Sequence, residues 1–131
     1  MSTNPPSSPT RELKVLRCLF EISQILDRSL DLKDTLDPVL GAMASHMGMM
    51  RGTITLVDQD SESINIEAAF GLSKSQLQRG TYKIGEGITG KVVESGKPVA
   101  VPKISEAPLF LNRTGARKGL RKKDISFICV P

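Results

Sequence analysis

The chain has 131 residues and a net charge of +4, with 39% hydrophobic and 24% charged residues. These values suit one ordinary globular domain and exclude a disordered chain, and no apolar run approaches the roughly 20 residues of a membrane span. One histidine and two cysteines are too few for a zinc site without carboxylates. The first fifteen residues are polar and rich in Pro and Ser, so we expect no signal peptide. We therefore predict a metal-free, cytoplasmic protein with no disulfide framework.

Positive charge is concentrated in residues 113–123, which hold six basic residues and no acid, whereas acids outnumber bases elsewhere. A DNA-binding domain usually adds a helix-turn-helix or a zinc framework to such a patch. Neither is visible, so we expect no direct contact with nucleic acid. We interpret the patch as a binding loop or a solvated turn.

Residues 1–9 contain three prolines among Ser, Thr and Asn, and predict a disordered leader. A helix is expected from Thr10, as its N-cap, to Leu30. Its apolar stripe repeats about every 3.5 residues, which suits a partner helix as well as the domain's own sheet. The candidate dimer contacts on this stripe are Val15, Leu19, Ile22 and Leu26.

A second helix begins at Asp31 and ends at Gly48. Pro38 leaves two alternatives: a bend in one helix, which we favour, or a true start at Asp37. One apolar face is expected, formed by Leu36, Val39, Leu40, Met43 and Met47.

The rest of the chain predicts short strands and helices. The expected elements are strands 51–58 and 64–70 as an antiparallel hairpin, a helix 73–79 capped by Ser73, an extended segment 81–84, a helix 88–94, a strand 98–102 and a buried strand 126–130. This order indicates an α+β domain with helices packed on an antiparallel sheet. Because such a sheet ordinarily continues with a strand and a closing helix, we expect residues 10–131 to be one domain truncated at its C-terminal edge.

The glycines at 85, 87 and 90 have the spacing of a dinucleotide fingerprint, but no strand–helix–strand unit surrounds them. We interpret them first as a tight turn that needs positive φ, with Gly90 allowing close packing. The same geometry exposes backbone N–H groups at the start of helix 88–94, where an anion is favoured and Thr89 adds a hydroxyl. No catalytic constellation is found: His46 suits a helix end, and neither cysteine has cationic sequence neighbours. We predict that the protein is not an enzyme.

The segment 84–102 (IGEGITGKVVESGKPVAVP) resembles the signature stretch of GAF domains, and 30–36 (LDLKDTL) resembles their usual start. The segment 108–117 (PLFLNRTGAR), followed by 125–131 (ISFICVP), is similar to the N-terminal domain of NifA-like activators of nitrogen-fixation genes.

The resemblance implies a sensory domain that controls a neighbouring ATPase domain, itself followed by a helix-turn-helix domain. In that family the control uses 2-oxoglutarate, a PII-type protein or an antagonist partner. A dicarboxylate needs a cationic anchor, which Arg113 or Arg117 would supply. The candidate ligand site is therefore Gly87, Ile88, Thr89, Arg113 and Arg117. The alternative is a ligand-free dimerisation and protein-interaction module.

Overall fold

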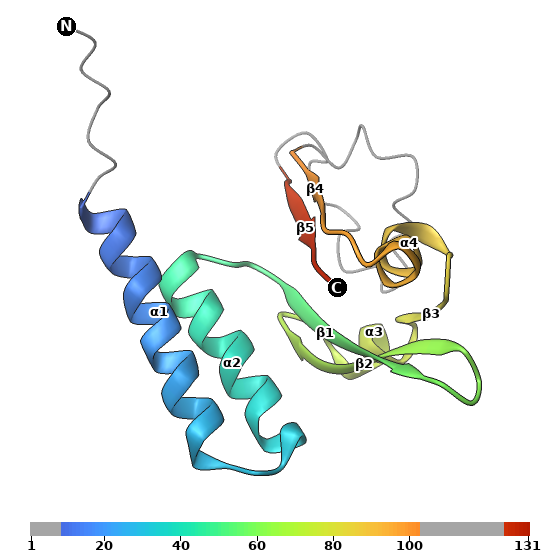
Figure 1. Ribbon diagram of the computed structural model, residues 1–131, viewed down its shortest axis with the longest axis horizontal. Coiled ribbons are helices and arrows are strands. Elements are labelled where there is room, and N and C mark those ends of the chain that lie inside the picture. The colour runs from blue at the N-terminus through green and yellow to red at the C-terminus, as the bar shows by residue number, and fades with distance from the viewer. Residues whose placement is uncertain (1–8, 103–124) are drawn as a thin grey trace, which may run out of the picture. The chain divides into compact units, whose positions relative to one another are not determined.

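The computed structural model describes residues 9–102 and 125–131 (Figure 1). Its elements are α1 (Pro9–Arg28), α2 (Leu32–Met47), β1 (Gly52–Asp58), β2 (Ser63–Phe70), α3 (Lys74–Gln78), β3 (Thr81–Lys83), α4 (Gly87–Ser95), β4 (Val99–Val101) and β5 (Phe127–Cys129). The predicted α+β class and element order are confirmed. Nearly all of the expected leader, residues 1–8, lies outside the described residues. In the described part of the chain, no helix is both long enough and apolar enough to cross a membrane.

The chain divides into two compact units. The first contains residues up to Ile54 together with Glu67–Gly71, and the second contains Thr55–Ile66 and the residues from Leu72 onward.

In the first unit, α2 is capped at both ends. The Asp31 carboxylate accepts a hydrogen bond from the backbone N–H of Lys33 at 2.9 Å, and Gly48 ends the helix with φ of 69°. The helix continues through Pro38. One helix from Asp31 is therefore confirmed, and a start at Asp37 is wrong.

The α2 helix buries residues on two sides instead of one continuous apolar face. Leu36 and Leu40 pack with Ala68 of β2 in the core of this unit. Ala42 is also buried, and its carbonyl oxygen lies 4.0 Å from the Cys18 Sγ of α1. Met43 and Met47 are exposed, so the predicted apolar face is wrong at its C-terminal end. The small Ala42 takes the buried position where α1 comes close.

The α1 helix begins one residue before the predicted boundary and ends two residues before it, at Arg28. Thr10 lies inside the helix, so its predicted capping role is wrong. Among the α1 side chains that the structure describes, Cys18 alone is buried. The helix packs against α2, while most of its large apolar side chains are exposed.

The predicted hairpin is confirmed, since β1 is the hydrogen-bonded neighbour of β2 and only a short turn joins them. In this turn the Ser61 hydroxyl, and then the backbone N–H of Asp60, hold the pKa of Asp58 below its ordinary value. On the other side of β2, β3 pairs antiparallel, with Ser63 opposite Lys83. The sheet order is therefore β1-β2-β3.

The second unit has its own buried residues, with Ile64, Ile88 and Val92 least exposed. Ser73 caps α3 as predicted and forms a reciprocal capping box with Gln76. β4 and β5 pair antiparallel, with Val99 opposite Cys129. The expectation that the last strand is buried is wrong, because Ile128 is 72% exposed. Alternation along a strand places Ile128 on the face opposite to its half-buried neighbours.

Candidate functional site

The turn between β3 and α4 depends on its glycines. Gly85 and Gly87 have φ of 86° and 62°, which side chains rarely adopt. A Cβ on Gly90 would collide with the Lys83 carbonyl oxygen and lie 2.9 Å from the Gly85 nitrogen. The Gly85 N–H also donates to the Gly90 carbonyl at 2.9 Å. The prediction of a tight turn with close packing at Gly90 is confirmed.

The start of α4 leaves its first backbone N–H groups without a side-chain cap from Glu86, the N-cap residue. Gly87 and Thr89 are partly exposed, whereas the Ile88 side chain is buried. Ile88 can therefore offer a ligand only its backbone. Gly87 and Thr89 are therefore the partly exposed positions at which an anion at this helix N-terminus would be bound.

One nearby group opposes an anion at this turn. The Glu94 carboxylate lies against the α-carbon of Gly85. A negative ligand at the start of α4 would approach a like charge, which weakens binding unless the exposed Glu94 side chain moves away.

The cationic half of the predicted ligand site cannot be placed beside this turn. Arg113, Arg117 and the rest of the basic stretch 113–123 lie outside the described residues. Their convergence with Gly87 and Thr89 stays a prediction.

The predicted dimer contacts on α1 are mostly exposed. Leu19 and Leu26 are 58% and 54% exposed, and Val15 is also exposed. Ile22 is half-buried, so it does not share the exposure of the other three. The structure thus presents three of the four side chains on an open apolar surface.

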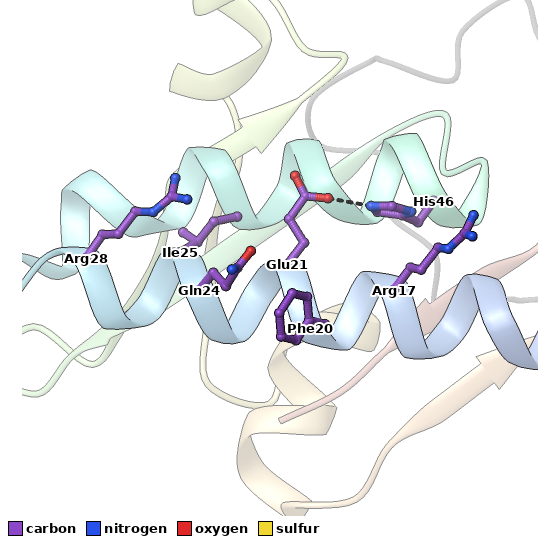
Figure 2. A pocket seen from close by; sticks show the side chains of 7 residues that line it. All are labelled: Arg17, Phe20, Glu21, Gln24, Ile25, Arg28 and His46. Atoms are coloured by element: carbon purple, nitrogen blue, oxygen red, sulfur yellow. Dashed lines mark hydrogen bonds and ion pairs between the residues drawn. The ribbon is translucent and has the colours of Figure 1, made fainter.

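Sequence reasoning missed a groove between α1 and α2. One cavity of about 310 Å³ contains the cross-helix pair of His46 and Glu21 (Figure 2). Its lining residues are Arg17, Phe20, Glu21, Gln24, Ile25, Arg28 and His46. A second cavity of about 630 Å³ shares Arg17 and His46 with the first; its other lining residues are Arg11, Lys14, Ser45, Met47 and Gly48. The missed signal was the three-residue spacing of Arg11, Lys14 and Arg17, which places them along one side of a helix.

His46 lies in the last turn of α2, as predicted, with its side chain 24% exposed. Its Nε2 atom is paired with a carboxylate oxygen of Glu21. The ring therefore links the two helices.

Both cysteines are free thiols. Cys18 is buried, and burial raises the pKa of Cys129 above its ordinary value. A raised pKa lowers the thiolate fraction, which is the opposite of what nucleophilic activation requires. Within residues 9–102 and 125–131, no group of three or more His, Cys, Asp or Glu residues is arranged to hold a metal ion.

The GAF domain family model matches residues 31–131. The chain belongs to the GAF domain family. The match includes the α4 turn and both strands of the β4–β5 pair, and it begins at the N-cap of α2. The helix α1 precedes the matched range.

Similar GAF domains occur in regulators of nitrogen fixation. The chain is 47% identical over 118 residues to nitrogen fixation protein VnfA and 45% identical over 119 residues to AnfA, both from Azotobacter vinelandii. It is 43% identical over 122 residues to the Nif-specific regulatory protein of Azospirillum brasilense. These matches cover 89%, 91% and 93% of this chain but only 23%, 22% and 19% of the relatives. The chain thus spans about a fifth of the length of the proteins that it matches.

Solved structures agree on the fold. The GAF domain of A. Aeolicus nlh2, in an inactive state, matches with a TM-score of 0.80 and 27% identity, covering 92% of this chain and 72% of that one. The GAF domain of a phosphoenolpyruvate-protein phosphotransferase from Coxiella burnetii matches with a TM-score of 0.76 and 21% identity, over 91% of this chain and 69% of that one. The resemblance to GAF domains and to NifA-like regulators is therefore confirmed.

Proposed function

We propose that this GAF domain is the sensory part of a NifA-type transcriptional activator of nitrogen-fixation genes. In this proposal it acts in the cytoplasm and controls an adjacent ATPase domain in response to a small metabolite, a PII-type or antagonist protein, or both. The observation that carries the proposal is the 42–47% identity to nitrogen-fixation regulators over most of this chain. A helix-turn-helix domain of the full-length activator, not this domain, would contact DNA.

The proposed metabolite is 2-oxoglutarate, bound at the start of α4. The N–H groups of Gly87, Ile88 and Thr89 would hold one carboxylate, and Arg113 or Arg117 would hold the other. The lack of a side-chain cap from Glu86 supports this site, because that residue leaves the first N–H groups of α4 available to a ligand. The nearby Glu94 carboxylate makes the expected affinity modest.

Isothermal titration with 2-oxoglutarate tests this proposal. We expect binding heat from the wild-type chain, weaker binding by Thr89→Val and tighter binding by Glu94→Gln. Removing one exposed like charge should tighten binding about two- to fivefold. The control is Glu67→Gln, which removes an exposed acid from β2. No heat from the folded wild-type chain at millimolar ligand would rule out this metabolite.

We propose further that the domain has no catalytic activity of its own. Cys18 is buried, burial raises the pKa of Cys129, and His46 is paired with Glu21 at a helix end. The fold does not decide this point, since a free methionine-R-sulfoxide reductase from Neisseria meningitidis shares it with a TM-score of 0.73 at 19% identity.

A second proposal is that α1 mediates a homodimer, with or without a small ligand. Its support is the exposed apolar surface formed by Val15, Leu19 and Leu26, because large apolar patches rimmed by charge mark contact surfaces. Leu19→Lys with Leu26→Lys should give monomers in light scattering. A matched control places the same two lysines at the exposed positions Leu32 and Met50. A dimer that survives the α1 substitutions would show that this surface is not the contact.

A further inference from the structure

The groove between α1 and α2 carries cations that no other described residue pairs with. Arg11, Lys14 and Arg17 line it at intervals of three residues, or about 4.5 Å along the helix axis. All three are exposed. Within the part of the chain that the structure describes, none of them is in an ion pair.

The pairing of Glu21 explains why Arg17 has no ion-pair partner among the described residues. Arg17 and Glu21 are four residues apart on α1, the spacing at which opposite charges on a helix normally meet. The Glu21 carboxylate instead pairs with His46 of α2. Figure 2 shows both Arg17 and Glu21 projecting toward the side of the groove where His46 lies. Arg17 is thereby left open to an outside carboxylate.

We propose that this groove binds an acidic segment of a partner protein. The cations extend over two turns of α1, and Arg28 adds another about 16 Å beyond Arg17 along the axis. An extended chain with several carboxylates can engage such a row, whereas a small dicarboxylate reaches at most two of its members. This inference does not depend on the ligand site at α4.

One feature favours an acidic peptide over a nucleic acid. Exposed Phe20 and Met47 line the cavities beside the cations and offer apolar contacts to peptide side chains.

The test is fluorescence anisotropy of the full 131-residue chain with a labelled twelve-residue peptide that alternates Glu with Ala and Leu. The comparison probe replaces every Glu by Gln. The test variant is Lys14→Gln with Arg17→Gln, which preserves helix propensity and creates no new repulsion. The control variant, Lys33→Gln with Lys74→Gln, removes the same charge from exposed helix starts outside the groove. Circular dichroism checks that each variant is folded.

We expect the acidic peptide to bind and the Gln peptide not to bind. The groove variant should weaken binding about fivefold, from the loss of two exposed charge pairs, and the control should change it less than twofold. Equal binding of both peptides, or equal losses in the two variants, would overturn the proposal. So would displacement of the peptide by millimolar succinate, which would indicate a small-anion site, or tighter binding of a twelve-base-pair DNA duplex.

Discussion

The two long helices of the first unit differ sharply in what they bury. The shorter one, α2, has caps at both ends and places Leu36, Leu40 and Ala42 in the interior. The longer one, α1, carries more large apolar side chains and yet buries only Cys18 among its described residues. Both have a regular apolar pattern in the sequence. A pattern therefore identifies a helix, whereas burial depends on which elements lie beside it.

The contrast suggests different roles. Because α2 packs on both β2 and α1, its apolar residues contribute to the stability of the domain. The exposed side chains of α1 contribute little to the stability of the domain and can contact other molecules. The apolar ones lie on the same side as Leu19, and the cationic ones lie along the groove. Two measurements test this difference between α1 and α2, and one compares α2 with the α4 turn.

The largest expected effect comes from truncating one leucine on each helix. Leu40 is 3% exposed, so Leu40→Ala should lower the free energy of unfolding by about 2–5 kcal/mol through lost burial and a cavity. Leu19→Ala should change it by less than about 0.5 kcal/mol. Urea denaturation at low protein concentration measures both. Similar losses at the two positions would show that α1 is as well packed as α2.

A pair of helical glycines gives effects of opposite sign. Gly41 of α2 has nothing within 4 Å of where a Cβ would be, so Gly41→Ala should stabilise by about 0.5–1 kcal/mol. Gly90→Ala of α4 would collide with the Lys83 carbonyl, and should destabilise by about 1–3 kcal/mol. Thermal unfolding of both variants provides the check. Stabilisation by both substitutions would contradict the close packing of the α4 turn.

The smallest effect is on the reactivity of the two thiols. Buried Cys18 should react with iodoacetamide more slowly than half-buried Cys129 in the native protein, and both should accelerate in urea. Burial raises the pKa of Cys129, so its native rate should keep rising at a pH where an exposed thiol has already reached its plateau. Mass spectrometry of each cysteine peptide measures the rates. A faster Cys18 would mean that α1 separates readily from α2.

Features set by local chemistry were predictable from the sequence. Ser73 predicts a capped helix, and the glycines at 85 and 87 predict a turn with positive φ, because each effect involves only a few neighbouring atoms. One helix through Pro38 was also predictable, since the apolar repeat continues on both sides of it.

Features set by partners in space were not predictable. Met43 and Met47 continue the apolar repeat of α2 but are exposed, because the buried cluster on this helix contains Leu36 and Leu40 and does not extend to them. The side chain of Ile128 lies on the exposed face of β5, which is only three residues long. The groove contains an ion pair between Glu21 and His46, which are 25 residues apart in the sequence, although Arg17 is nearer to Glu21 along the chain. Half of the predicted ligand site, Arg113 and Arg117, lies outside the described residues.

The central claim, that this GAF domain regulates a nitrogen-fixation activator, can be tested by exchange. This chain would replace the segment that it matches in the Nif-specific regulatory protein of Azospirillum brasilense, with expression of a nif reporter as the readout. We predict that the reporter keeps the control seen with the unmodified regulator, and that deleting the segment abolishes that control. A chimera that accumulates normally but behaves like the deletion would contradict the account.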